Sequence, residues 1–121
     1  MKKNHIDLGR RGEELARRHL LLQNMSILTS NYTFRKGEID VIAMDGQELV
    51  FVEVKTRNSN YFGEPYQAVN RTKQRQIIKV ANQFIQERKL NYDVRFDIIS
   101  IVINNHQTKV QHIKNAFTPF V

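Results

Sequence analysis

Two carboxylates and a lysine lie within one predicted β-hairpin, in the segment "GEIDVIAMDGQELVFVEVKTR" at residues 37–57. Asp40 belongs to the first strand of this hairpin, and Glu53 and Lys55 belong to the second. A buried carboxylate without a partner is costly or takes up a proton. Two carboxylates beside a lysine in a half-apolar site are instead suited to a divalent cation such as Mg²⁺, which keeps waters that a substrate phosphate can displace.

The geometry of the hairpin follows from its turn. Asp45-Gly46 is a dipeptide typical of two-residue turns, and it predicts Asp40 opposite Phe51. Side chains alternate between the faces of a sheet, so Asp40, Glu53 and Lys55 would share one face. The two carboxylates would be diagonal neighbours, with their Cα atoms about 7–8 Å apart. The same face carries Ile42, Leu49 and Phe51. That composition favours a metal site over the alternative, a solvated edge on which these charges are merely neighbours.

The elements that position the hairpin are predicted from apolar periodicity and turn residues. Helices are expected over residues 6–24 and 70–89, and further strands over 26–34, 94–103 and 109–117. The order is helix, three strands, helix, two strands, which predicts a single α/β domain over residues 1–121. Its mixed central β-sheet of about five strands would be flanked by helices. The segment "LVFVEV" is apolar on both faces apart from its Glu, which indicates a central strand covered on both sides.

The composition adds a bias in charge. The chain has 19 Lys and Arg against 12 Asp and Glu, a net charge of +7. Such a surplus favours nucleic acid or anionic lipid as a partner, although many solvated lysines give the same sum. Cysteine is absent, which excludes disulfides and thiolate zinc sites and is compatible with a reducing cytoplasm. No segment is apolar enough for a membrane span or a signal sequence, so we expect a cytoplasmic protein.

Longer motifs surround the charged residues. They are "GRRGEELA" at residues 9–16, "GEIDVIA" at 37–43, "LVFVEVKTR" at 49–57 and "RFDIISI" at 95–101. In this order they closely resemble the YraN-like bacterial family, described as uncharacterised proteins with an endonuclease-like fold. The pattern of Asp40, Glu53, Val54 and Lys55 is also similar to the D-x(n)-E-x-K core of the PD-(D/E)xK nuclease superfamily. Ile39 stands where the wider superfamily has proline, at a position that contacts no metal.

The resemblance implies a restriction-endonuclease-like core and a role for each matching residue. In nucleases of this superfamily the positions of Asp40 and Glu53 hold Mg²⁺ or Mn²⁺, and the backbone carbonyl matching Val54 often completes the metal's ligands. The position of Lys55 orients or activates the attacking water. Glu13 matches an acidic residue of the first helix that some resolvases place at the metal's edge. The implied reaction is phosphodiester hydrolysis in DNA, in branched or recombining structures by analogy with resolvases.

Basic and polar residues outside the motif are candidates for nucleic-acid contacts. Gln67 and Lys73 lie where related nucleases place such a residue near the scissile phosphate, although Lys73 is equally well a solvated lysine of a first helical turn. Arg57, Arg71, Arg75 and Lys79 would form a strip that follows phosphates, or else a solubilising surface.

Four further residues have two interpretations each. Tyr61, Phe62 and Tyr66 follow the motif, and we favour packing onto the core over stacking on unpaired bases. Asp97 alternates with apolar residues along its strand, and we interpret it as structural, paired with Arg95 or Arg88, rather than as a ligand.

Two other function classes stay open at this point. The first is a catalytically inactive nucleic-acid-binding module on the same fold, and the second is a protein-interaction adaptor. The complete set of Asp40, Glu53 and Lys55 speaks against both, because neither needs costly charges kept together. A homodimer also stays open, since resolvase-like nucleases usually act as dimers.

Overall fold

Helices and strands alternate in the expected αβββαββ order in the computed structural model, which describes residues 5–119 and their side chains from residue 7 onward. A short 3₁₀ helix, η1, is added before the second α-helix. The elements are α1 (His5–Leu22), β1 (Ser26–Phe34), β2 (Gly37–Asp45), β3 (Glu48–Arg57), η1 (Pro65–Ala68), α2 (Arg71–Arg88), β4 (Asp93–Ile103) and β5 (Thr108–Phe117).

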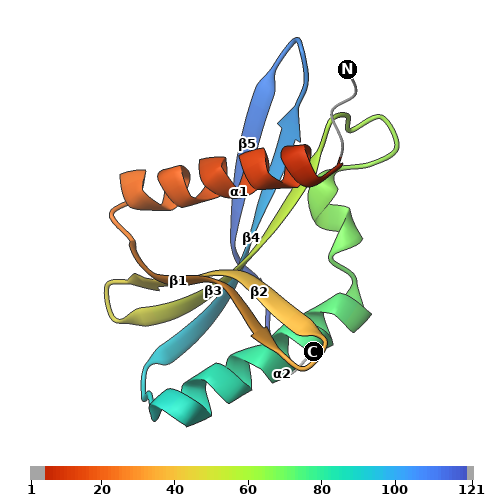
Figure 1. Ribbon diagram of the computed structural model, residues 1–121. Helices are drawn as coiled ribbons and strands as arrows, with labels where there is room; N and C mark the ends of the chain where they lie inside the picture. The colour runs from red at the N-terminus through yellow and green to blue at the C-terminus, as the bar shows by residue number, and fades with distance from the viewer. Residues whose placement is uncertain (1–4, 120–121) are drawn as a thin grey trace.

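The strands form one mixed sheet in the order β1-β2-β3-β4-β5. This confirms the predicted mixed sheet of about five strands. The β3–β4 pair is parallel, and the other three pairs are antiparallel. A parallel pair needs a crossover, and the chain makes it through η1 and α2. Figure 1 shows the strongly twisted sheet with α1 above it and α2 below it. The central strand is therefore β3, which carries Glu53 and Lys55.

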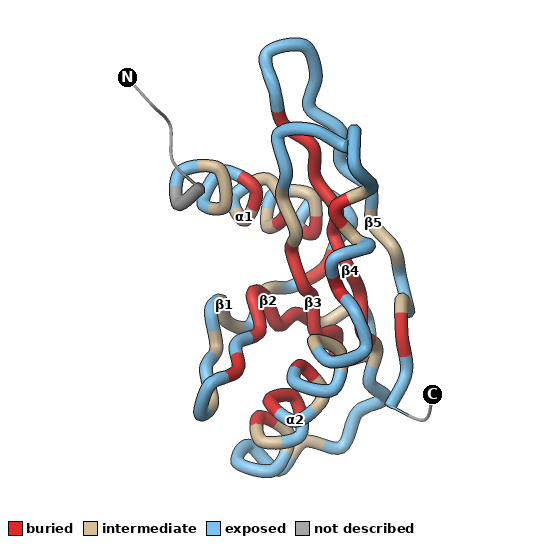
Figure 2. The backbone as a smooth tube through the Cα atoms, turned by 90° about the vertical axis from the view of Figure 1, so that its right-hand side faces the viewer, coloured by how far each residue is buried: buried red, intermediate tan, exposed pale blue. Residues whose placement is uncertain are grey.

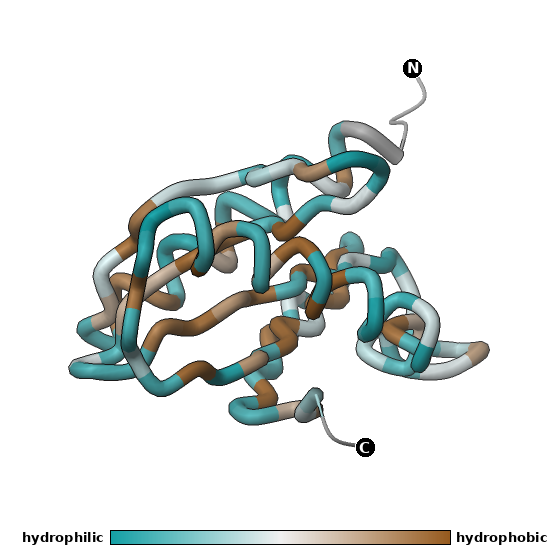
Figure 3. Tube along the Cα trace, turned by 90° about the horizontal axis from the view of Figure 1, so that it is seen from below, coloured by the Kyte–Doolittle hydropathy of each residue, from teal (hydrophilic) through white to brown (hydrophobic). Residues whose placement is uncertain are grey.

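Each face of the sheet has its own apolar core. Ala16 and Leu20 of α1 pack on one face against Val41, Val50 and Val52. On the other face Ile77 and Phe84 of α2 pack in a second buried cluster with Ile42, Leu49 and Phe51 of the sheet. Buried segments run through β3 and β4 in Figure 2, and hydrophobic residues follow the strands in Figure 3. Any polar side chain at the centre of β3 therefore lies within an apolar surrounding.

The register of the β2–β3 hairpin differs from the prediction. Asp45 pairs with Glu48 and Ile42 with Phe51, so the two turn residues are Gly46 and Gln47 rather than Asp45 and Gly46. Gly46 has a φ of 61°, a conformation that glycine adopts without a steric penalty. The shared face of Ile42, Leu49 and Phe51 survives this shift, because one strand slides past the other by two residues, which is a whole side-chain period. Continuing the register places Asp40 opposite Glu53, so the prediction that it faces Phe51 is wrong.

The N-terminus of helix α2 lies next to the hairpin and is capped. The Asn70 side chain accepts a hydrogen bond of 3.0 Å from the backbone N–H of Lys73, which satisfies one of the free donors of the first turn. The helix ends at Arg88, and Lys89 follows in the left-handed conformation with a φ of 53°. This cap sets Lys73 in the first turn of α2, at the end of the sheet where Glu53 lies. No helix in residues 5–119 is long and apolar enough to cross a membrane.

Candidate active site

Asp40 lies where the regular pairing of β2 stops. The β2–β3 ladder ends at the pair of Val41 and Val52, and beyond it the Val54 amide donates a hydrogen bond of 2.8 Å to Oδ2 of Asp40. On the other side of β2, the β1 ladder passes over Asp40 and Asn31, and Asn31 has a φ of 53°. A side-chain carboxylate thus replaces the backbone partner that a continued ladder would give to Val54. The sheet opens at this point, and Asp40 bridges the opening.

The alternation of side chains along β2 also breaks here. Ile39 packs in the same cluster as Ile42, on the α2 face, whereas Val41 packs on the α1 face. Strict alternation would instead place Ile39 together with Val41. The prediction that Asp40 projects from the sheet like its neighbours therefore needs correction, because its carboxylate turns toward the backbone of β3.

The two carboxyl groups are buried and interact. Asp40 is 8% exposed and Glu53 is 6% exposed. Burial, together with repulsion by the Glu53 carboxylate, raises the pKa of Asp40 to about 8. Burial also raises the pKa of Glu53, although Lys73 and Lys55 oppose this rise. Two buried carboxylates side by side repel each other if both are ionised. The pair must therefore bind either a proton or another cation.

Glu53 has one oxygen paired and one left over. Its Oε2 lies 3.6 Å from Nζ of Lys73, the first-turn lysine of α2. Its Oε1 is buried and has no hydrogen-bond partner among the described residues. A buried carboxylate oxygen without a hydrogen-bond donor is rare in folded proteins. It indicates that a water molecule or an ion binds there. Lys55 follows two residues later on β3, half-buried, and acts on Glu53 electrostatically.

Glu13 reaches the same site from α1. Gly12 of this helix lies against β3 so closely that a Cβ atom there would be 1.8 Å from Oγ1 of Thr56. This approach brings the next residue, Glu13, close enough for its charge to contribute to the raised pKa of Asp40. The Asn31 side chain donates a hydrogen bond of 3.1 Å to Oε1 of Glu13. Glu13 of α1 therefore lies within electrostatic range of Asp40, which interacts with Glu53 of β3.

The donor set fits a hard divalent cation. Asp40 and Glu53 offer carboxylate oxygens, one of which is buried and unpartnered, and Mg²⁺ or Mn²⁺ is the kind of ion that such oxygens bind. Within residues 5–119, however, no three His, Asp or Glu side chains stand ready in a metal-binding cluster. Two protein carboxylates and several waters match the way Mg²⁺ is held in most enzymes. Val54 enters the site through its amide, and the role of its carbonyl stays a prediction.

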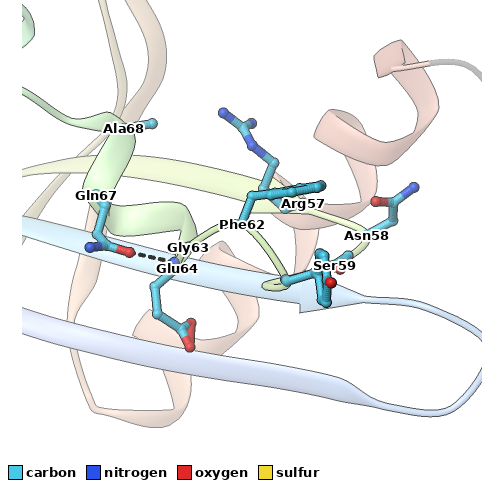
Figure 4. Close-up of a pocket in the computed structure, with 9 residues that line it drawn as sticks. Arg57, Asn58, Ser59, Phe62, Gly63, Glu64, Gln67 and Ala68 are labelled. Carbon is cyan, nitrogen blue, oxygen red and sulfur yellow. Dashed lines mark hydrogen bonds between the residues drawn. The ribbon is translucent and has the colours of Figure 1, made fainter.

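The predicted nucleic-acid residues spread away from the carboxylates in two directions. Arg71 and Arg75 are exposed on α2, on either side of Lys73 in the sequence. Arg57 is exposed at the end of β3 and lines a pocket with the following loop (Figure 4). Gln67 lines the same pocket from η1, where its Oε1 accepts a hydrogen bond of 2.6 Å from the Glu64 amide. Of this set, Lys73 alone forms an ion pair with a candidate catalytic carboxylate in the described residues.

The model of the uncharacterised protein family UPF0102 matches residues 12–101. The chain belongs to this family. It is 43% identical over 116 residues to a UPF0102 protein of Christiangramia forsetii, covering 96% of this chain and 98% of the relative. It is 44% identical over 118 residues to one of Geobacter metallireducens, covering 97% of each, and 46% identical over 112 residues to one of Thermodesulfovibrio yellowstonii, covering 93% and 96%. The resemblance to YraN-like proteins is thereby confirmed.

The UPF0102 match runs from Gly12 through Ile101, so it spans every candidate residue from Glu13 to Arg75. It begins at the glycine that seats α1 on β3 and ends within β4. Strand β5 lies outside the matched residues. The matched residues therefore include the segments of α1, β2 and β3 that carry Glu13, Asp40 and Glu53.

A second polar cluster, away from the carboxylates, is structural. Asp97 is fully buried and accepts hydrogen bonds of 2.9 Å from Nε and Nη2 of Arg95, which confirms the predicted pairing with Arg95. His112 Nε2 lies 2.8 Å from Asp97, and His19 Nε2 lies 3.0 Å from the other ring nitrogen of His112. Burial alone would raise the pKa of Asp97, but bonds from His112 and Arg95 hold it below its usual value. This chain of contacts ties α1 to β4 and β5.

Sequence reasoning missed or misjudged several contributors to these sites. The Asn31–Glu13 bond and the His19–His112 contact join residues far apart in the chain, and neither carries a sequence signal. The expectation that Tyr61 and Phe62 pack onto the core is wrong, because they are 83% and 98% exposed. For Tyr66 the same expectation is confirmed, since its side chain packs against the α2-side core.

Proposed function

We propose that this UPF0102 protein is a divalent-metal-dependent nuclease that hydrolyses phosphodiester bonds in DNA. The observation that carries the proposal is the buried pair of Asp40 and Glu53, in which Oε1 of Glu53 has no hydrogen-bond partner among the described residues. A stable core does not require such a pair, since apolar residues of similar volume would be at least as stable. Its retention is explained by a bound cation and an anionic substrate.

Each residue has a separate task in this proposal. Asp40 and Glu53 hold Mg²⁺ or Mn²⁺, and Glu13 stands at the edge of the same site from α1. The bound ion supplies Lewis acidity toward a phosphate oxygen and a more acidic water. Asp40 is itself held in place by the Val54 amide, so its orientation is fixed before any ion arrives.

The two lysines complete the site. Lys55, on the same strand as Glu53, orients the attacking water and offsets the negative charge that develops on the phosphate. Lys73 stands 3.6 Å from Glu53 and is partly exposed, so it can exchange this carboxylate for a phosphate oxygen of the substrate. Arg57, Arg71 and Arg75 contact the flanking phosphates, consistent with the net charge of +7.

The test begins with metal binding. Mn²⁺ and Mg²⁺ are titrated by calorimetry into the wild type and into an Asp40→Ala, Glu53→Ala double variant, with and without DNA. Heat that appears for the wild type and disappears for the variant supports the site. If the wild type shows no heat of metal binding either with or without DNA, the nuclease proposal is contradicted. The inactive nucleic-acid-binding module is then the better explanation.

Cleavage is tested separately from binding through Lys55. A nuclease loses cleavage in a Lys55→Ala variant but keeps its DNA affinity within a small factor, because the remaining phosphate contacts persist. Duplexes, single strands and four-way junctions serve as substrates, with products resolved on denaturing gels. If the wild type binds DNA but cuts none of these substrates with either ion, the protein is the catalytically inactive nucleic-acid-binding module instead.

A further inference from the structure

Two adjacent aromatic residues stand in solvent at the tip of the loop that follows β3. Phe62 is 98% exposed and Tyr61 is 83% exposed, and their rings contact edge to face with centroids 4.8 Å apart. A single exposed aromatic residue needs no explanation, but an adjacent pair with almost no protein contact is unusual. In Figure 1 this loop, between β3 and η1, projects from the body of the molecule at the upper right.

The loop is built to present these rings. The carbonyl of Asn60 accepts a hydrogen bond of 3.1 Å from the amide of Gly63, which closes a turn with Tyr61 and Phe62 as its two central residues. Turn centres normally carry small or polar residues, so local chain geometry does not account for two large aromatic side chains there. The Tyr61 amide also donates a bond of 3.0 Å to the Ser59 hydroxyl.

The base of the loop is anchored on both sides. The Asn104 side chain donates a hydrogen bond of 3.0 Å to the carbonyl of Asn58. Glu64 accepts one of 3.1 Å from the Asn60 side chain and lies 3.4 Å from the ammonium of Lys109. The rings therefore project from a fastened loop, and little ordering entropy has to be lost when they contact a partner.

The pocket beside the rings shares Arg57 with β3, the strand that carries the candidate catalytic residues Glu53 and Lys55. It has a volume of about 770 Å³, is lined by Tyr61, Phe62, Gln67 and Arg57, and is shown in Figure 4 with Arg57 between the loop and η1. Arg57 follows Lys55 by two residues on β3, which stays regularly paired with β4 to this point. Alternation then puts both side chains on one face, about 7 Å apart along the strand. A backbone phosphate at Lys55 would have its neighbour near Arg57 and its bases near the aromatic pair.

We propose that Tyr61 and Phe62 are a stacking platform for unpaired nucleobases, and that the preferred substrate has a single-stranded segment next to the scissile phosphate. The proposal rests on the proposed function, because it names the substrate feature that the same site takes. Aromatic rings beside a basic groove are the combination that binds single strands, since every base offers a flat face for stacking. Paired bases in a duplex have both faces covered and gain nothing from the platform.

The absence of tryptophan from the chain makes a direct test available. A Phe62→Trp variant carries one indole at the platform, and a Tyr92→Trp variant carries one at a position that is 46% exposed and away from the loop. Each is titrated, in a chelator to prevent cleavage, with a short single-stranded DNA, the blunt duplex of the same sequence, and that duplex with a single-stranded tail. Stacking predicts quenching of the Phe62→Trp signal by the single strand and the tailed duplex, with little quenching by the blunt duplex. The Tyr92→Trp signal stays unchanged with all three.

Affinity gives an independent measurement. By fluorescence anisotropy, a Tyr61→Ala, Phe62→Ala variant should bind the single strand about tenfold more weakly than the wild type, with the blunt duplex affected less than about threefold. The Tyr92→Ala variant is the matched control, and retained duplex binding demonstrates that the double variant is folded. An unquenched indole, or equal losses for single strand and duplex, overturns the platform.

These outcomes separate the two proposals. A protein that binds and cuts DNA equally well with and without the aromatic pair keeps the nuclease function and loses the platform. A wild type that binds none of the three DNA probes, with or without Mn²⁺, contradicts both. A single strand that quenches and a tailed duplex that does not would restrict the platform to free single strands.

Discussion

Gly12 of α1 and Thr56 of β3 lie so close that any side chain at position 12 would overlap the threonine hydroxyl, with a Cβ atom 1.8 Å from Oγ1. The contact seats the helix on the central strand and brings Glu13 to Asp40. A Gly12→Ala substitution should therefore lower the free energy of unfolding by about 1–3 kcal/mol, despite alanine's better helix propensity. Chemical denaturation measures the change.

The neighbouring glycine supplies a matched control. A Cβ atom at Gly9, in the same helix, would meet nothing within 4 Å. Gly9→Ala should thus be neutral or stabilise the protein by up to about 1 kcal/mol. Equal losses for the two variants would mean that the close approach of α1 to β3 is not what position 12 provides. A Thr56→Ala substitution should recover part of the loss in a Gly12→Ala background.

Asp40 should destabilise the metal-free protein as it ionises. Its pKa is about 8 in the folded state against an ordinary value of 3.8, so between these pH values the folded protein binds more protons than the unfolded chain. The free energy of unfolding then decreases as the pH rises from about 4 to about 8. Asp40→Asn removes this dependence and keeps an acceptor for the Val54 amide, so in a chelator it should raise the melting temperature more at pH 8 than at pH 4. A variant less stable than the wild type at pH 8 would contradict this account.

The affinity for the metal should depend on whether Asp40 is protonated. A cation competes with the proton on Asp40, so Mn²⁺ binding should tighten by up to about tenfold per pH unit until the pH reaches about 8, and then level off. Calorimetry over this range measures the dependence, together with proton release in buffers of different ionisation enthalpy. In Glu53→Gln, which lacks the second carboxylate, binding should be much weaker at every pH.

Lys73 should affect metal and substrate in opposite directions. Its ammonium lies 3.6 Å from Glu53 and repels a cation bound there. Lys73→Ala should therefore tighten Mn²⁺ binding about two- to tenfold while it slows DNA cleavage, because a phosphate contact is lost. Lys79→Ala removes an exposed lysine from the same helix and should leave metal affinity unchanged. Weaker metal binding in Lys73→Ala would show that the lysine supports the metal site instead.

Asp97 should be essential for stability but not for metal binding. Its removal leaves Arg95 and His112 without their shared carboxylate, and truncation of a buried ionic partner typically costs about 3–5 kcal/mol. We expect that loss for Asp97→Ala in denaturant unfolding, against less than about 0.5 kcal/mol for Asp93→Ala at the exposed start of β4. The folded fraction of Asp97→Ala should still bind Mn²⁺ like the wild type, and a loss of binding would assign Asp97 to the site.

The order of the elements, the central position of β3 and the two faces of the hairpin were predictable from the amino-acid sequence. Each of these depends on local periodicity, which a shift of two residues leaves unchanged. The sequence also singled out Asp40, Glu53 and Lys55, because charged residues in an apolar hairpin are conspicuous without any coordinates, whereas Glu13 was found through the resemblance to resolvases. The pairing of Asp97 with Arg95 was likewise readable, since residues two apart on a strand share a face.

How the charged residues meet became visible in the folded protein alone. The turn at Gly46 and Gln47 could not be told from one at Asp45 and Gly46, because both are compatible with the same alternation. The β2–β3 ladder ends next to Asp40, which the β1–β2 ladder also leaves unpaired at Asn31, and the loop that carries Phe62 is anchored by residues more than 40 positions away, such as Asn104. Such contacts are set by packing between distant segments, which local sequence patterns do not encode.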